Sequence, residues 1–427
     1  MFSIVAWLLL LMAPGSPWET GEVSEGNENR YYSKSDQCFQ SLKGEAHALN
    51  LGQRWGDSYP AATMLLDLES VTSATSFFDF RTLDPEGLIF YGDTNPSVDW
   101  FILALRQGKL EMQIHNNITK ITVSGGQRLN DGRWHRILVK NEGHTVLLEL
   151  DGEDYLTLNH VSHSIIEEHI SLMRIGVGGL LIPMQELLVP LNTAMDGCIR
   201  HWNWLNKTSE WQEAASLEDK GIKGCFPTIR PGSFFPGDGL ATFSLSALPT
   251  GLNSASGSWS LTVEMWVKAA LQSATLMAVS APRQTPVFRL DVQHTDLVLQ
   301  VGNRTTTLPG LLPEGCQESH LLLRFAPTHL AVVLEDDEIL LPALDDDVES
   351  LQQLWLDKKG DLVIGGLPGQ KLSVPAQEGH YFRGCLRGIK VQGQELDFDS
   401  AQFRSNSIWA HSCPGGDGGK ISADLKH

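Results

Sequence analysis

Short apolar runs separated by turn residues dominate this chain. LIFY at residues 88–91 and WFILAL at residues 100–105 are bounded by DPEG and GDTNP, which are typical turn sequences, so the pattern predicts two β-strands joined by loops. LEMQIHNN, HRILVK at 135–140 and TVLLELDGE at 145–153 continue this pattern, and Asp151-Gly152 predicts a tight hairpin. Sustained helical periodicity is scarce. We therefore expect an all-β sandwich.

The second half of the chain repeats the first in outline. HTVLLELDGEDYLTL is echoed by THLAVVLEDDEILLP, RIGVGGL by LVIGGL, and MDGCIRHWNW by FRGCLRGIKV. The spacing agrees as well, because Ile175 and Cys198 lie 23 residues apart while Ile364 and Cys385 lie 21 apart. Repeated order and spacing indicate a tandem duplication of one fold.

Composition changes along the chain divide it into six parts, and its 427 residues are enough for two domains. We expect a signal peptide at 1–18, a polar and flexible extension at 19–58, a first domain at 59–226, a linker at 227–240, a second domain at 241–413 and a flexible glycine-rich tail at 414–427.

The N-terminus has the layout of a secretory signal peptide, since an apolar run from Ile4 to Met12 is followed by Pro14, Gly15 and Ser16. That run is too short for a stable membrane anchor, which takes roughly 20 apolar residues. We expect a secreted, extracellular protein. The formal charge of −19 repels nucleic-acid phosphates and anionic membrane surfaces, so neither nucleic acid nor membrane insertion is expected.

Six cysteines in a secreted chain predict disulfides. Cys198 and Cys225 lie 27 residues apart and Cys385 and Cys413 lie 28 apart, which suggests one local bridge in each domain. Cys38 and Cys316 remain, and the sequence leaves open whether they pair with each other, pair between chains or stay free. Asn-x-Ser/Thr sequons make Asn206, Asn303 and Asn117 glycosylation candidates, with Asn117 the weakest because it sits in a strand-like run.

Several motifs resemble those of laminin G-like domains. They are DGRWH at 131–135, the paired glycines of IGVGGL, and DGCIR before a final strand. The resemblance implies two tandem laminin G-like jelly-roll β-sandwiches. Both halves match, although DGRWH has no counterpart in the second half.

Within this family, the first half is most similar to a steroid-binding branch, through RTLDPEGLIFYGDTNPSVDWFILAL at 81–105 and RLNDGRWH. The resemblance implies a steroid buried between the two sheets of the first domain. Ser76 would hold the oxygen on the steroid A ring, and Asp99 and Asn116 would hold the hydroxyl at the far end. The expected apolar walls are Phe101, Val139 and Met173. Asn141 stands where mammalian members of the branch have a methionine.

The same positions have simpler interpretations without the resemblance. Ser76 is then a serine on a turn or strand surface, Asp99 a turn residue, and Phe101 and Met173 ordinary core residues. Asn116 is less easily explained, because an asparagine on an apolar face needs hydrogen-bonding partners.

Metal sites are also implied by the resemblance. Asp84, Glu86 and the main-chain oxygen of Ala194 match a structural calcium site, and hard oxygen ligands suit calcium. The alternative is a DPEG turn in which Asp84 acts as a cap. DDDVE at 345–349 is a second candidate for binding calcium, but we expect it to be a solvated acidic loop. No zinc is predicted, because Asn117 and Ile170 replace the histidines that bind zinc in mammalian members.

Catalysis is not expected. The chain has no HExxH, GxSxG, P-loop or CxxC motif. Glu149 and Asp151 are the best carboxylate pair, since residues two apart on a strand share a face, as a sandwich-fold glycosidase would require. The hairpin at Asp151-Gly152 is the simpler explanation for them.

The resulting hypothesis is a secreted plasma carrier that binds androgens and oestrogens in its first domain and regulates their free concentration. The resemblance also implies a homodimer formed through strands of the first domain. An extracellular or cell-surface protein is a further candidate partner. The main alternative is an adhesion or receptor-binding pair of laminin G-like modules with no small ligand. The second domain lacks the polar residues expected of a steroid site.

Overall fold

The computed structural model describes most of the expected domains. The described residues are 39, 45, 47–52, 59–70, 75–96, 98–141, 144–159, 172–205, 224–252, 257–270, 272–282, 284–313, 317–342, 345–367 and 381–415. The predicted signal peptide, Cys38, Cys316, Asn206, Ile170 and the tail beyond residue 415 lie outside these ranges.

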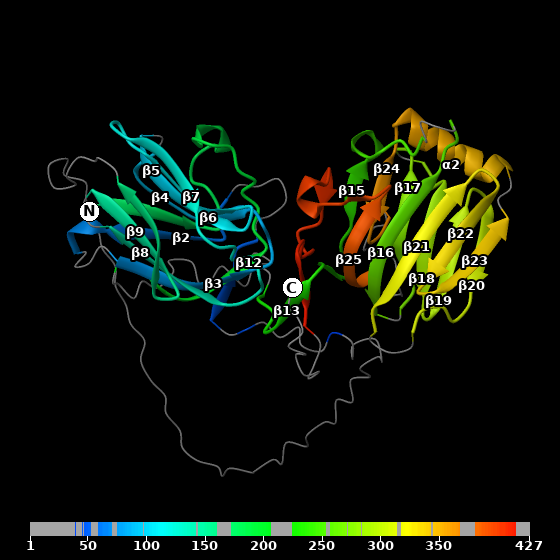
Figure 1. Ribbon diagram of the computed structural model, residues 1–427, viewed down its shortest axis with the longest axis horizontal. Helices are drawn as coiled ribbons and strands as arrows, with labels where there is room; N and C mark the ends of the chain where they lie inside the picture. The colour runs from blue at the N-terminus through cyan, green and yellow to red at the C-terminus, as the bar shows by residue number, and fades with distance from the viewer. Residues whose placement is uncertain are drawn as a thin grey trace, which may run out of the picture. The chain divides into compact units, whose positions relative to one another are not determined.

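The first half forms two six-stranded sheets, with orders β1-β12-β3-β8-β9-β10 and β2-β11-β4-β5-β6-β7 (Figure 1). The first sheet contains β1 (Ala48–Asn50), β3 (Thr75–Thr82), β8 (His135–Asn141), β9 (Thr145–Leu150), β10 (Glu153–Asn159) and β12 (Gly197–Asn203). The second contains β2 (Ala62–Asp67), β4 (Gly87–Asn95), β5 (Asp99–Arg106), β6 (Lys109–His115), β7 (Lys120–Gly125) and β11 (Leu172–Val177). Short 3-10 turns lie at η2 (Leu68–Ser70) and η3 (Met184–Glu186).

Side chains along each strand point alternately to the two faces of its sheet, and the apolar side chains on the inward faces form the core between these two sheets. On β3, Phe78 and Phe80 are fully buried, and they share a hydrophobic core with Phe90 of β4 and Leu103 of β5 from the other sheet. Residues two apart on a strand point to the same face, so Ser76 lies on the inward face with both phenylalanines. The sandwich thus places one serine at the end of an apolar stripe.

The second half repeats this architecture with two seven-stranded sheets and a two-stranded β13–β28 pair. One sheet runs β14-β25-β16-β21-β22-β23, with β26 beside β25, and the other runs β20-β19-β18-β17-β24-β15-β27. The bounds of the first sheet are β14 (Ser233–Pro236), β16 (Leu261–Ala269), β21 (Ser319–Ala326), β22 (His329–Leu334), β23 (Asp337–Pro342), β25 (Arg383–Val391) and β26 (Gln394–Glu395). Those of the other sheet are β15 (Ala241–Ser244), β17 (Ala274–Ser280), β18 (Phe288–Gln293), β19 (Asp296–Val301), β20 (Arg304–Leu308), β24 (Asp361–Ile364) and β27 (Phe403–Arg404). The remaining elements are β13 (Ile229–Pro231), β28 (Ser412–Pro414), η4 (Leu245–Ala247) and η5 (Phe398–Ser400).

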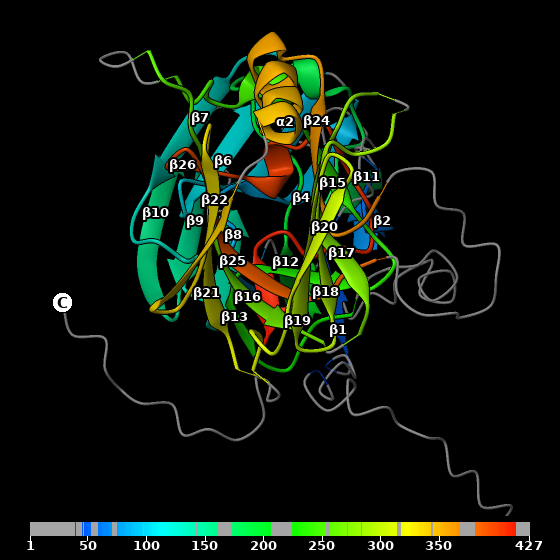
Figure 2. The same cartoon turned by 90° about the vertical axis from the view of Figure 1, so that its right-hand side faces the viewer.

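The expectation of an acidic loop at 345–349 is wrong, because this segment begins the helix α2 (Asp345–Asp357). Val348, Leu351 and Trp355 recur at helical spacing, and all three are buried in the core of the second sandwich. Figure 2 shows α2 over one end of the two layers of this sandwich. Burial of these three side chains stabilises the helix.

Three predicted boundaries also differ from the structure. The extension at 19–58 contains β1, which pairs with β12, so the first sandwich begins before residue 59. The linker at 227–240 contains β13 and β14, and β14 pairs with β25. Pro414, expected in the tail, belongs to β28. These strands are three or four residues long, which is too short for an alternating pattern to be recognised in sequence.

Both predicted disulfides are present, since Cys198 is bonded to Cys225 and Cys385 to Cys413. The predicted hairpin at Asp151-Gly152 is also confirmed. Both residues have positive φ, 54° and 88°, as a type I′ turn requires. Within the described part of the chain, no helix is long and apolar enough to cross a membrane.

Candidate ligand-binding site

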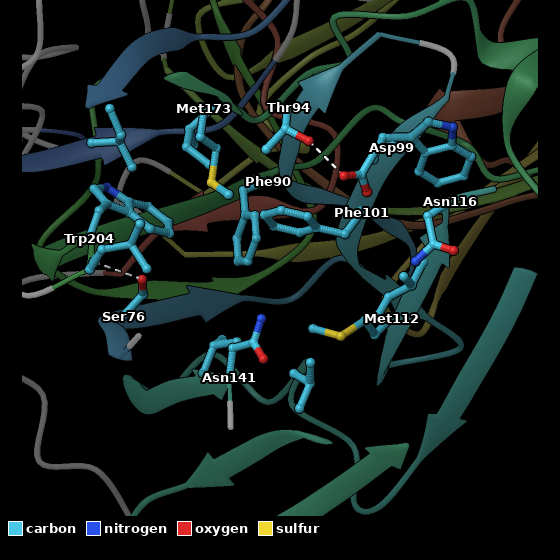
Figure 3. Close-up of a pocket in the computed structure, with 17 residues that line it drawn as sticks. Ser76, Phe90, Thr94, Asp99, Phe101, Met112, Asn116, Asn141, Met173 and Trp204 are labelled. Carbon is cyan, nitrogen blue, oxygen red and sulfur yellow. Dashed lines mark hydrogen bonds between the residues drawn. The ribbon is translucent and has the colours of Figure 1, made fainter. Parts of the chain in front are cut away.

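A cavity lies inside the first sandwich, open between its two sheets (Figure 3). It receives side chains from both sheets and from the segment after β12. The lining residues are Leu66, Ser76, Phe90, Thr94, Asp99, Trp100, Phe101, Met112, Ile114, Asn116, Val139, Asn141, Val146, Met173, Ile175, Trp204 and Leu205. The lining is mostly apolar with a few polar groups, as in sites that bind small molecules.

Ser76 provides the polar group at one end of the cavity. It is 8% exposed and pairs across the sheet with Val139 of β8, which lines the same cavity. Its Oγ accepts a hydrogen bond from the backbone N–H of Leu205 at 3.0 Å. Because this bond uses the hydroxyl as an acceptor, its hydrogen can be donated to a ligand oxygen.

Asp99 and Asn116 lie at the opposite end, as Figure 3 shows. Asp99 begins β5, and its Oδ2 accepts a hydrogen bond of 2.6 Å from the Thr94 hydroxyl. Asn116 follows β6, and its Oδ1 accepts bonds from the backbone N–H groups of Ile118 at 2.8 Å and Thr119 at 2.6 Å. Both side chains are therefore held in place by neighbouring protein groups.

Aromatic rings form the wall between the two polar ends. Phe90 meets Phe101 edge to face with ring centroids 6.0 Å apart, and it meets Trp204 edge to face at 5.2 Å. Such pairs hold the rings in fixed orientations. Met112 and Met173 complete this wall with flexible thioether side chains, which fill irregular gaps.

Asn141 is the polar group that lines the cavity between its ends. It is the last residue of β8, two positions beyond Val139, and it is exposed at the open end of the strand. In Figure 3 its amide points toward the space below Phe90 and Phe101, between Ser76 and Met112. The site thus has polar groups at three places.

Three comparisons place the chain among known proteins. A profile described as "Laminin G domain" matches residues 80–210. The solved structure of mouse laminin alpha1 chain, domains LG4-5, is 17% identical, covers 88% of this chain and 96% of its own, and superposes with a TM-score of 0.59. At this identity the likeness shows the fold alone, and it confirms the expected tandem laminin G-like sandwiches.

Sequence similarity to whole proteins is closer. Human sex hormone-binding globulin is 38% identical over 359 residues, which are 83% of this chain and 84% of the relative. The chain belongs to the sex hormone-binding globulin family. The same globulin from Crocuta crocuta is 37% identical over 83% of this chain and 86% of its own. Neither these relatives nor the laminin G domain is named as an enzyme. The similarity to the globulins also does not favour the alternative hypothesis, which was an adhesion or receptor-binding pair of modules with no small ligand.

The six steroid-site residues expected from the sequence all line this one cavity of the globulin-family fold: Ser76, Asp99, Phe101, Asn116, Val139 and Met173. Residues that the sequence did not single out are Thr94, Phe90, Met112 and Trp204. Thr94 lies within GDTNP, which reads as a turn, although β4 continues to Asn95. Trp204 follows the final strand, and nothing in its local pattern separates it from an ordinary core tryptophan.

The expected calcium ligands lie together near the start of β4. Asp84 is 1% exposed, and its two oxygens accept bonds from the backbone N–H groups of Glu86 at 3.0 Å and Asp196 at 2.9 Å. Glu86 Oε1 accepts a bond of 3.0 Å from Asn192 N–H. A Cβ on Gly87 would lie 2.4 Å from the carbonyl oxygen of Ala194, so that carbonyl approaches the same turn. Two carboxylates and a carbonyl are hard oxygen donors, which fit calcium chemically.

His411 lies beside the same cluster. Its Nε2 is 2.8 Å from Asp399 Oδ2 and 3.6 Å from Asp84 Oδ1. Burial raises the pKa of Asp84 to about 7, and the nearby His411 opposes this rise. Burial also disfavours the charged imidazolium, but Asp84 and Asp399 outweigh it and raise the pKa of His411 to about 10. The cluster therefore holds a cationic histidine between two carboxylates.

The carboxylate pair considered for catalysis is not arranged on one strand face. β9 ends at Leu150, and Asp151 lies in the hairpin that follows. The Asp151 carboxylate accepts a hydrogen bond from Arg136 N–H at 2.8 Å and pairs with His135 Nδ1 at 2.9 Å. Its oxygens are thus used to fix the turn against β8.

Two sequons lie within the described residues. Asn303 is exposed between β19 and β20. Asn117 is exposed in the turn between β6 and β7, outside both strands, so the reason for ranking it lowest does not apply.

Proposed function

We propose that this protein is a secreted carrier that binds one androgen or oestrogen in the cavity of its first sandwich and regulates the free concentration of that steroid in plasma. The observation that carries the proposal is an apolar cavity with hydrogen-bonding groups at its two ends. A steroid is a rigid apolar body with an oxygen at each end, so its shape and polarity match this arrangement.

The Ser76 end suits the A-ring oxygen. The hydroxyl of Ser76 donates to a ketone or phenol oxygen, while its own oxygen is held by Leu205 N–H. A buried polar atom that has no hydrogen-bonding partner costs about 1–3 kcal/mol. A steroid bound with its A-ring oxygen away from Ser76 would incur this cost, so the contact sets the orientation of the bound steroid.

The Asp99 end suits a hydroxyl group at position 17. An ionised carboxylate can only accept, so it pairs with a ligand O–H and does not pair with a ketone. Thr94 holds one oxygen of this carboxylate. Asn116 Oδ1 is bonded to the backbone, so a contact from Asn116 to the ligand would use its Nδ2 donor.

The aromatic and thioether walls supply most of the affinity. Apolar surface gains about 25 cal/mol per Å² when it leaves water, and a steroid has few polar atoms to offset that gain. The polar ends set orientation and selectivity. No bond in the ligand needs to change, and we propose that the protein is a binding protein without catalytic activity.

Calcium has a structural role in this proposal. Asp84, Glu86 and the Ala194 carbonyl would hold the ion, which would join the turn before β4 to the loop before β12. The support is the convergence of these hard oxygen atoms at one place. Zinc has no role in the proposal.

The remaining proposals concern assembly and location. We assign residues 59–226, together with β1, to the steroid-binding domain and place the protein outside the cell as a homodimer formed through first-domain strands. Asn117, Asn206 and Asn303 are its glycosylation candidates. A protein partner at the cell surface is compatible with this arrangement, and the second sandwich has no assigned ligand.

Substitution at the two polar ends tests the proposal. We expect Asp99→Ala and Ser76→Ala each to weaken binding of tritiated dihydrotestosterone by about 10-fold or more, because each leaves a buried ligand oxygen without its partner. Asp238→Ala, at an exposed aspartate outside the cavity, is the matched control and should bind like the unaltered protein. Unchanged affinity in both cavity variants would contradict the assignment of this site.

A further inference from the structure

His115 is the last residue of β6, and its side chain contacts the segment that carries Asp99, although His115 is not among the residues that line the cavity. Its Nδ1 is 3.0 Å from the carbonyl oxygen of Val98, the residue directly before Asp99. A carbonyl oxygen only accepts hydrogen bonds, so Nδ1 carries the hydrogen and donates it. One ring nitrogen of His115 therefore holds the backbone on the N-terminal side of Asp99.

The same ring contacts the residue on the other side of Asp99. Trp100 is the cross-strand partner of His115, and the two rings are stacked, with centroids 5.3 Å apart and planes 3° from parallel. Trp100 is 1% exposed and is buried in a hydrophobic cluster with Tyr91 and Ile102. Packing in this cluster fixes Trp100 together with the stack, and His115 contacts the residues on both sides of Asp99.

These contacts join the two parts of the chain that carry the polar groups at this end of the cavity. Asp99 begins β5, whereas Asn116 directly follows His115 at the end of β6. The β4–β5 turn is closed by a hydrogen bond of 3.2 Å from Val98 N–H to the carbonyl oxygen of Asn95. Since Val98 is bonded both within its turn and to β6, these bonds set the spacing between Asp99 and Asn116.

Asp99 is therefore restrained in two ways. Thr94 donates to one oxygen of its carboxylate at 2.6 Å, which sets the direction of the side chain. The bond from His115 to Val98 sets the position of the backbone from which this side chain projects. A hydrogen bond between two oxygens needs a separation of about 2.5–3.0 Å, so a small displacement of the backbone at Asp99 is enough to lose the contact to a ligand hydroxyl.

We propose that His115 is a positioning residue of the steroid site: without touching the ligand, it holds Asp99 and Asn116 at the spacing that binds a 17-hydroxyl group. The inference rests on the proposed function and extends it by naming the residue that sets the preference for a 17-hydroxyl over a 17-ketone. Other residues form the apolar walls, so this preference is separable from binding of the apolar body of the steroid.

The test compares three steroids that share the A ring and the apolar body. Testosterone has a 17-hydroxyl, androstenedione has a 17-ketone, and androst-4-en-3-one has no oxygen at position 17. Equilibrium dialysis of tritiated testosterone against the full chain, with the other two steroids as competitors, gives the three affinities.

Two variants separate the contacts of the ring, and a third is a control. His115→Phe keeps the stack on Trp100 and removes the hydrogen bond. His115→Asn removes the stack and keeps a donor, because the amide nitrogen of asparagine is as many bonds from Cα as Nδ1 is. His329→Phe makes the same substitution at an exposed histidine of β22 in the second sandwich.

We expect His115→Phe to weaken testosterone binding about 10-fold, the value of one hydrogen bond, and to leave androst-4-en-3-one binding unchanged. The preference for testosterone over androstenedione should shrink accordingly. His115→Asn should retain most of this preference, because Trp100 stays buried in its cluster without the stack, and His329→Phe should retain all of it. Unchanged binding of androst-4-en-3-one shows that a variant is folded and that its apolar walls are intact.

The inference is overturned if His115→Phe weakens binding of all three steroids by one factor, or if it changes none of the three affinities. Loss of the preference in His115→Asn as complete as in His115→Phe also overturns it, as does equal binding of testosterone and androstenedione by the unaltered protein. Each of these results leaves the proposed function intact, because the unaltered protein still binds testosterone. Absence of saturable testosterone binding to the unaltered protein overturns the proposed function, and this inference with it.

Discussion

Gly92 of β4 lies directly under the ring of Phe101 on β5. The two residues are cross-strand partners, and a Cβ on Gly92 would lie 2.3 Å from Cζ of Phe101. The absence of a side chain at residue 92 therefore decides where the Phe101 ring lies in the cavity wall. Both residues occur in the segment 81–105 that also contains Asp99.

Gly92→Ala should thus weaken steroid binding without touching a polar group. The added methyl group forces the Phe101 ring to move, and the change alters the shape of the cavity. We expect about a 10-fold loss of dihydrotestosterone affinity in equilibrium dialysis. Gly152→Ala is a control for a glycine substitution with open space around it, although its positive φ carries its own strain. Unchanged affinity in Gly92→Ala would mean that Phe101 does not form the wall.

Thr94 should act on the ligand through Asp99. Thr94→Val keeps the shape of the side chain and removes the hydroxyl that donates to Asp99 Oδ2 at 2.6 Å. The carboxylate then loses its fixed orientation, so we expect about 5-fold weaker binding of testosterone and a smaller preference over its 17-ketone, androstenedione. A parallel measurement of both ligands checks this. If the ratio of the two affinities is unaffected, Thr94 has only a structural role.

His411 should stabilise the fold in a pH-dependent manner. The pKa of His411 in the folded protein is about 10 and its ordinary value is 6.5, so the stabilisation is full below about pH 6.5 and is lost as pH rises through about 10. His411→Gln should lower Tm by about 3 °C or more at pH 7, and the gap should shrink toward pH 10. Thermal unfolding in EGTA at several pH values measures this gap. A gap that grows with pH would contradict the assignment.

Calcium should stabilise the protein through Glu86. A ligand that binds only the folded state adds stability in proportion to the logarithm of its concentration, about 2.7 kcal/mol at 100 times Kd. Tm should therefore rise with calcium in the unaltered protein, and Glu86→Gln, which keeps the size of the side chain, should reduce this rise. Magnesium serves as the control ion. If calcium raises the Tm of both proteins equally, Glu86 is not a ligand of the ion.

The sequence predicted the strands because their apolar runs and turns are strong local signals. It brought Ser76, Asp99 and Asn116 together only through resemblance, since Ser76 lies on β3, Asp99 begins β5 and Asn116 follows β6, and no local pattern joins them. Thr94 was missed because GDTNP reads as a turn although β4 runs through most of it. Helix α2 was missed because the acidic run at 345–349 was interpreted as a solvated loop, although acidic residues are common at a helix N-terminus. Val348, Leu351 and Trp355 become buried only through tertiary packing.

The central claim is that the first sandwich binds one steroid in its cavity. Equilibrium dialysis of the purified full chain against tritiated dihydrotestosterone, with calcium present, tests it most directly. The account predicts saturable binding with one steroid per chain, weakened in the Asp99→Ala variant. No saturable binding at micromolar steroid would contradict the account.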